Sequence, residues 1–231
     1  MCFSLQASAV MAAVGAAVSY FAWRRLNWKI GVFLLTFTVM QLIHVLAYIH
    51  INDCTHPLNQ AAAYANHVHI SLQPVAYLIG IHGILEAIGK SNRRIAQHYN
   101  VLIYGALVAG ALAILRLFGD TQHHSCEWCG PPCSFSGKHH VDFSVPLTKE
   151  NYFAPGPFIH AFFFFIVGLF ISDGSAIATV LMAVITFVPA QFLQVSGTEA
   201  ATIWCFGSIA QILITVALMF FLRRRLPTPR P

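Results

Sequence analysis

Charged side chains are scarce in this sequence. Lys, Arg, Asp and Glu together make up 9% of the 231 residues, whereas hydrophobic residues make up 57% and the mean hydropathy is +0.67. A soluble domain carries roughly 25% charged residues, because water must solvate most of its surface. So few charges exclude a water-soluble globular fold, and they indicate a polytopic protein whose surroundings are the lipid bilayer.

Three further absences narrow the class of protein. The chain does not open on the pattern of a cleaved signal peptide, because residues 5–23 form an apolar segment of full membrane-spanning length. No acidic or basic residue stands at the middle of an expected span, which argues against an ion-coupled transporter with a carboxylate relay. The last span, 200–222, contains no Lys, and this excludes a retinal Schiff base.

Seven apolar segments of membrane-spanning length predict an all-α fold, a single seven-helix transmembrane bundle. The loop 119–153 is the only sizeable part expected outside the membrane, and we expect it to form a lid over one end of the bundle. The expected spans are 5–23, 30–49, 64–88, 99–118, 154–172, 174–195 and 200–222.

The basic residues indicate the orientation of the bundle. Ten of the thirteen Lys and Arg follow the first, third and seventh spans, and only Arg116, Lys138 and Lys149 fall on the other side. The positive-inside rule then places the N-terminus outside and the C-terminus in the cytoplasm. The formal net charge of +5 is therefore a topology signal, and we expect no nucleic-acid partner. The ten are Arg24, Arg25, Lys29, Lys90, Arg93, Arg94, Arg223, Arg224, Arg225 and Arg230.

The outer loop is rich in cysteine and histidine: residues 123–140 read HHSCEWCGPPCSFSGKHH. The spacing of Cys126, Cys129 and Cys133 is typical of a structural zinc site. On the non-cytoplasmic side, thiols more often form disulfides, and Cys54 in the other outer loop is then the natural partner for one of the three, although spacing does not choose which. A third interpretation makes Cys126 and Cys129 the exchange-active pair of a thiol–disulfide oxidoreductase.

Polar side chains inside the spans follow helical spacing. Gln41, His44 and Tyr48 stand at i, i+3 and i+7, which places them on one helix face. The next span repeats the spacing with Asn66, His69 and Gln73. Polar groups in lipid usually face the bundle interior, and nearly all of these lie in the outer half of their spans. They predict a polar pocket that opens outward beneath the 119–153 loop.

The histidines of this region suggest a metal site. We predict His69 and His140 as ligands, with His44 and His160 as further candidates, because imidazole suits zinc, copper and iron. Glu199, at the outer mouth of the last span, can then act as acid or base on metal-bound water. The leading hypothesis is a metal-dependent membrane enzyme, hydrolytic or oxidative. The thiol–disulfide oxidoreductase and a non-enzymatic, receptor-like or accessory subunit that packs on a membrane-protein partner remain alternatives.

Several short motifs together resemble a family of uncharacterised, mostly bacterial, multi-pass membrane proteins that begin Met-Cys-Trp/Phe-Ser. The resemblance implies a seven-span architecture and no particular activity. Gln41 and Ser144 depart from the pattern, since a Glu is usual at both positions. The motifs are Met1-Cys2-Phe3-Ser4; Asp53-Cys54 with Pro57, Asn59 and Gln60; His69 to Pro74; Cys133 to Gly137 with His140 and Pro146; and Glu199 with Ile203-Trp204-Cys205.

Overall fold

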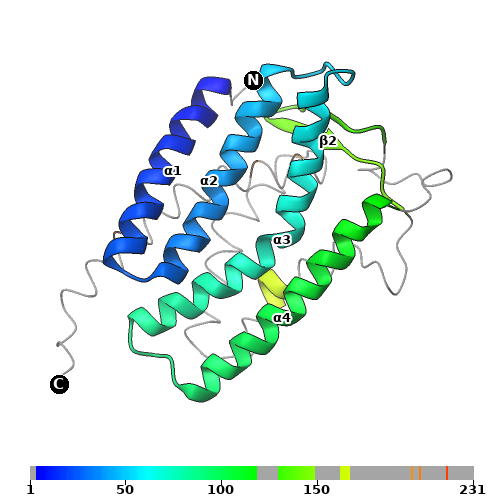
Figure 1. Cartoon of the computed structure of the whole chain (residues 1–231). Coiled ribbons are helices and arrows are strands. Elements are labelled where there is room, and N and C mark those ends of the chain that lie inside the picture. Colours follow the sequence, from blue (N-terminus) through cyan, green and yellow to red (C-terminus); the bar gives the residue numbers. More distant parts are fainter. Residues whose placement is uncertain are drawn as a thin grey trace.

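The computed structural model describes residues 4–118, 130–148 and 162–166, together with Glu199, Ile203 and Ala217. Most of this part is helical, as the sequence predicts. Helices α1 to α4 follow one another in space in chain order, and each packs against the next (Figure 1). The long helices are α1 (Leu5–Arg25), α2 (Trp28–Ile49), α3 (Pro57–Ala87) and α4 (Arg93–Leu115); the 3-10 turn η1 (Arg116–Phe118) and the π-helical turn η2 (Phe162–Ile166) are short.

Four helices among the described residues are long and apolar enough to cross a membrane. They correspond to the first four expected spans, although α3 begins at Pro57 rather than at residue 64 and α4 at Arg93 rather than at residue 99. The structure does not support the full seven-helix bundle. The expected spans 154–172, 174–195 and 200–222 lie outside the described residues, apart from η2 and three single residues, so they stay a prediction.

Side chains placed just ahead of each helix satisfy its first free amides. Ser4, Asn27 and Asn92 accept hydrogen bonds from the backbone N–H groups of Ala7, Lys29 and Ile95. The His56 ring does the same for α3, whose first residue is proline. Such capping groups stabilise a helix start by about 1 kcal/mol each, and they explain why the chain turns where it does.

Small residues allow α1, α2 and α3 to approach closely. In lipid there is little hydrophobic drive between helices, so close van der Waals contact carries the packing. A Cβ built on Gly80 of α3 lies 2.5 Å from Cβ of Phe33 on α2, which leaves no room for a side chain. The buried residues of α1 are small in the same way: Ser8, Ala12, Gly15, Ser19 and Ala22.

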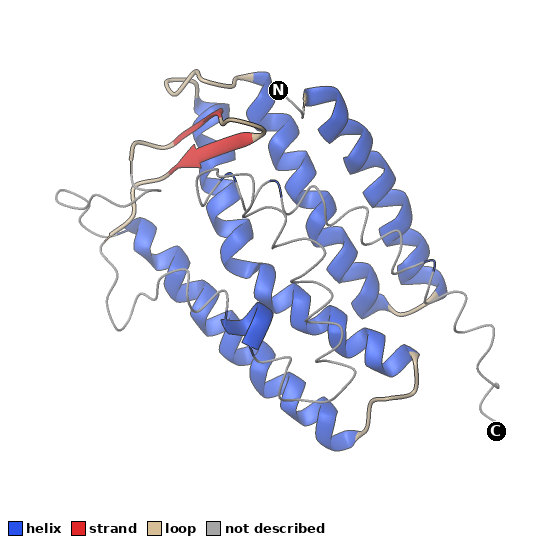
Figure 2. Ribbon diagram, turned by 180° about the vertical axis from the view of Figure 1, so that it is seen from behind, coloured by secondary structure: helices blue, strands red, loops and turns tan. Residues whose placement is uncertain are grey.

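Part of the 119–153 loop forms a β-hairpin, so the all-α prediction is wrong there. Strands β1 (Cys133–Ser136) and β2 (Val141–Ser144) pair antiparallel, with Cys133 opposite Ser144 and Ser136 opposite Val141. The hairpin lies at the end of the bundle where α2 ends and α3 begins (Figure 2). It is therefore a folded cover rather than an irregular lid.

Two asparagines attach this hairpin to the α2–α3 end. The buried Asn59 donates from Nδ2 to the carbonyls of His50 and Ser134, both at 2.7 Å, and accepts from Ser134 N at 2.8 Å. Asn52 accepts from Ser136 N at 2.8 Å and adopts a positive φ of 67°, a conformation that asparagine tolerates. A disulfide between Cys54 and Cys133 joins the same two segments.

Substituting Gly80 by alanine tests the helix packing. The added methyl group collides with Phe33, so we expect a loss of about 1–3 kcal/mol in unfolding free energy and a lower unfolding temperature. Circular dichroism of the detergent-solubilised protein during heating measures the unfolding temperature.

Gly105 of α4 provides the matched control. A Cβ there meets Phe163 at an ordinary 3.5 Å, and alanine favours a helix over glycine by roughly 0.5–1 kcal/mol. Gly105→Ala should leave stability unchanged or slightly higher. Equal unfolding temperatures for the two variants would contradict the packing of α2 on α3.

Candidate functional site

His140 lies at the centre of the candidate site, at the end of the hairpin turn just before β2. Its ring meets His44 of α2 edge-on, with ring centroids 4.6 Å apart and planes at 76°. Its Nδ1 lies 2.9 Å from the hydroxyl of Tyr48, one helical turn further along α2. The hairpin therefore places a histidine from the 119–153 loop directly on the polar face of α2 that the sequence predicts.

Three fully buried residues and the half-buried His69 carry buried polar atoms with no hydrogen-bond partner among the residues that the structure describes. These atoms are both amide atoms of Gln41 and Asn66, both ring nitrogens of His44, and Nε2 of His69. An unpaired buried group costs about 1–3 kcal/mol, so such a concentration is unusual in a native fold. We call Gln41, His44, Asn66 and His69 the buried polar cluster.

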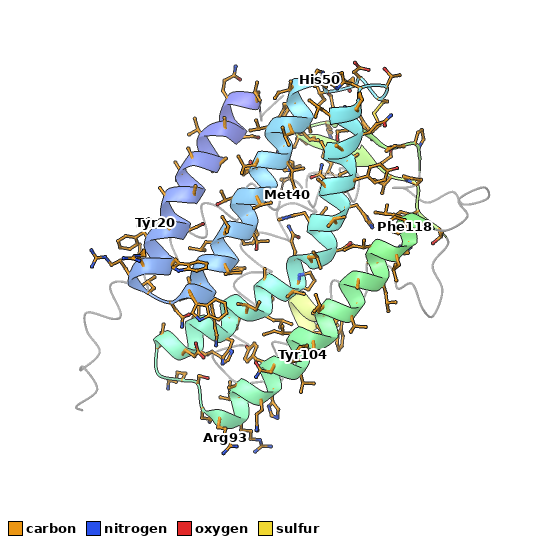
Figure 3. The ribbon with its side chains drawn as sticks, viewed as in Figure 1. Tyr20, Met40, His50, Arg93, Tyr104 and Phe118 are labelled. Atoms are coloured by element: carbon orange, nitrogen blue, oxygen red, sulfur yellow. A yellow bond between two sulfur atoms is a disulfide. The ribbon has the colours of Figure 1, made fainter. Side chains whose placement is uncertain are left out.

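Within each helix, these side chains lie close together along the axis. Gln41 and His44 are about 4.5 Å apart along α2, and so are Asn66 and His69 along α3, at 1.5 Å per residue. The two helices are antiparallel neighbours, and His44 lies within electrostatic reach of both His69 and His140. Figure 3 shows this stretch of α2, marked by Met40, between the end that carries His50 and the end that carries Arg93.

Burial keeps His140 uncharged at neutral pH. It lowers the pKa of His140 from 6.5 to about 4, because removal from water disfavours the protonated ring. A neutral imidazole keeps one nitrogen lone pair. If Nδ1 donates to the Tyr48 hydroxyl, that lone pair is on Nε2, the arrangement found in metal-binding histidines whose other nitrogen is hydrogen-bonded.

Glu199 holds the hairpin turn. Its Oε1 accepts a hydrogen bond from His140 N at 2.7 Å and another from His139 N. A Cβ on Gly137 would lie 2.5 Å from the Glu199 carboxyl carbon and 2.8 Å from the His140 carbonyl oxygen, so this turn requires glycine. The buried carboxylate thus positions His140 through the backbone, and its predicted role as acid or base stays a prediction.

The structure brings together most of the predicted site residues that it describes. His44, His69 and His140 gather around one end of α2 and α3, and Glu199 reaches the same hairpin from far along the chain. Within the described ranges, however, no three His, Cys, Asp or Glu side chains are arranged to hold a metal ion. His160, Cys126 and Cys129 lie outside the described residues.

The sequence analysis did not identify the residues that hold the hairpin in position, as opposed to those that line the site. Asn59 and Ser134 fix the hairpin on the helices, and neither carries reactive chemistry that would single it out. The signal for both was their place in the family motifs that contain Cys54 and Cys133, the two cysteines that the structure pairs.

The buried His140 predicts a pH dependence of stability. Because its pKa is about 4 in the folded chain and near 6.5 in the unfolded chain, the unfolded state binds the proton more tightly. The stability that neutral His140 contributes is fully present above about pH 6.5 and is lost as the pH falls towards 4, by up to roughly 3 kcal/mol. Thermal unfolding at successive pH values measures the loss.

The matched variants are His140→Gln, which removes the titrating group, and His98→Gln, which changes an exposed histidine on α4. The first should make the dependence between pH 6.5 and 4 less steep by the contribution of one histidine, and the second should leave it as in the wild type. A wild-type slope in His140→Gln would show that His140 is not buried under the hairpin.

Comparison with known proteins places the chain in a family without assigning an activity. Residues 6–226 match a family of unknown function (DUF5765), whereas no curated protein and no solved structure matches. The matched range contains the buried polar cluster, the hairpin and Glu199, and it leaves out Met1 to Ser4. Because the match covers nearly the whole sequence, the chain belongs to this family of unknown function.

Proposed function

We propose that this chain is a seven-helix integral membrane protein that binds a transition-metal ion at the hairpin end of its bundle and acts there as a metal-dependent enzyme. The observation that carries the proposal is the environment of the His44 ring. Both of its ring nitrogens are buried with no hydrogen-bond partner in the described part of the chain, and its ring contacts a second buried histidine, His140. In the neutral ring one of these nitrogens carries a proton and the other a lone pair, and a bound metal cation would accept that lone pair.

The donor chemistry fits zinc, copper or iron. Neutral imidazole is a common ligand for each of these ions, and the lowered pKa of His140 keeps it in that form. A catalytic zinc site uses three protein ligands and leaves a fourth position open. His44 and His140 supply two of them in this proposal, and the third comes from a changed rotamer of His69 or from His160.

The neighbouring groups suit a polar substrate without net charge. Gln41 and Asn66 each offer an amide donor and an acceptor, and both face the same interior as His44. Tyr48 would hold His140 in orientation, and Glu199 would hold the turn that carries it. A bound ion of this kind supplies Lewis-acid or redox chemistry, which allows hydrolysis or oxidation.

We further propose that the hairpin end faces away from the cytoplasm, with the N-terminus outside and the C-terminus inside. The support is the distribution of basic residues, since Arg24, Arg25, Lys90, Arg93 and Arg94 all lie at the opposite end of the described helices. A cystine between Cys54 and Cys133 is stable in such an oxidising compartment.

Elemental analysis of the purified full chain tests the metal proposal. We expect one equivalent of zinc, copper or iron in the wild type, and less than a tenth of it in His44→Ala and in His140→Ala, because each removes a ligand. His98→Ala, on the exposed side of α4, should retain the wild-type content.

Circular dichroism establishes that each variant is folded before the comparison. A metal-free wild type that regains no metal when supplied with each ion would overturn the proposal. So would folded His44→Ala protein with the full metal content. In either case the buried polar cluster would serve a different ligand.

A further inference from the structure

The end of the bundle opposite the hairpin carries a concentration of positive charge. Exposed Arg24 lies in the last turn of α1, and exposed Lys90 lies between α3 and α4. Exposed Arg93 and Arg94 are the first two residues of α4. Contacts of Asn27 and Lys29 with Glu86 bring the α1–α2 turn beside the end of α3, so these segments share one end of the molecule. We call Arg24, Lys90, Arg93 and Arg94 the basic band.

The basic band has no acidic counterpart among the described residues. Glu86 is the only described carboxylate at this end, and it pairs with Lys29 at 2.6 Å and with Asn27 at 3.0 Å. None of the four band residues forms an ion pair with any described side chain. Their charge is therefore directed outward, towards the surroundings of the protein.

Helix stability does not account for the position of these charges. Arg93 and Arg94 occupy the first turn of α4, where the helix dipole disfavours cations. The helix start already has its own cap, since Asn92 accepts from Ile95 N at 3.0 Å. The stability of α4 therefore does not explain why two arginines stand at its start.

Aromatic side chains mark the level of a membrane surface beside the band. Trp23 is 49% exposed, Trp28 is 53% exposed and Tyr20 is 69% exposed, all around the α1–α2 turn. Tyr20 and Arg93 both lie towards the end away from His50 (Figure 3). Exposed Trp and Tyr of membrane proteins gather where acyl chains meet the headgroups, and this position sets Arg24 at headgroup level.

We infer that the basic band binds the phosphate groups of anionic phospholipids, so that this end of the protein selects anionic over zwitterionic lipid. Each Lys or Arg near an anionic membrane surface contributes roughly fivefold to association. Four such residues without acidic neighbours therefore produce a preference of well over tenfold in their annular lipid. The inference is independent of any metal at the other end.

Lipid retention tests the inference on the full chain. The protein is reconstituted in nanodiscs of equimolar phosphatidylglycerol and phosphatidylcholine and extracted gently, and the lipids that remain bound are quantified by mass spectrometry. We expect phosphatidylglycerol to be enriched at least tenfold in the wild type. The quadruple variant R24Q/K90Q/R93Q/R94Q should retain the two lipids in nearly equal amounts.

Three controls separate charge from folding. The variant R24K/R93K/R94K keeps every positive charge and should keep the enrichment, and K138Q at the hairpin end should have no effect. On the unaltered wild type, molar salt should remove the enrichment, because it shortens the screening length to about 3 Å.

Several results would overturn the inference. Equal retention of both lipids by the wild type would do so, and so would unchanged enrichment in the quadruple variant, which would leave these charges as topology signals only. Displacement of the lipid by inorganic phosphate would show a site for free anions. Equal loss in the charge-retaining and neutral variants would trace the effect to structure rather than to charge.

Discussion

The side-chain amide of Asn59 is the contact on which the arrangement of the candidate site depends. It sits fully buried near the start of α3 and bonds both to the end of α2, at His50, and to strand β1, at Ser134. One side chain thus joins the start of α3 to the end of α2, nine residues earlier, and to β1, 75 residues further along the chain. The Cys54–Cys133 disulfide and the Asn52 contacts secure the same junction. Because the hairpin is held here, its turn can carry His140 onto His44 rather than into solvent.

The two ends of the described helices therefore differ in the polar side chains that they carry. The hairpin end encloses uncharged polar groups, several of which have no hydrogen-bond partner among the described residues. The opposite end carries exposed charge, with its one described carboxylate paired to Lys29. Helices that are long and apolar enough to cross a membrane separate the two ends.

The sequence predicts the helical part well because its signal is strong. Long apolar segments locate α1 to α4, although α3 and α4 begin seven and six residues before the expected starts. The i, i+3, i+7 pattern of Gln41, His44 and Tyr48 identifies the face that meets His140. The hairpin was missed because strands of four residues, such as Cys133–Ser136, are too short to show a clear alternation. The sequence names Cys54 as the partner of one of three loop cysteines, but it does not choose Cys133, because that choice depends on which segment the Asn59 contacts place beside Cys54.

Residues from three of the motifs that carry the family resemblance lie at the same end of the structure. Cys54 and Asn59 belong to one motif and Cys133 and Ser134 to another, and the structure makes them the two halves of a single junction. Glu199, from the last motif, binds the turn of the same hairpin. Residues that are far apart along the chain thus build one end of the molecule. Composition and spacing do not show that these residues are in contact.

Peptide mapping under non-reducing conditions tests this junction most directly. After proteolysis of the purified, unreduced protein with free thiols blocked, mass spectrometry identifies which cysteine-containing peptides are covalently linked. A peptide containing Cys54 joined to one containing Cys133 is the predicted result. Cys133 joined instead to Cys126 or Cys129, with Cys54 alkylated, would contradict the placement of the hairpin and, with it, of His140 on His44.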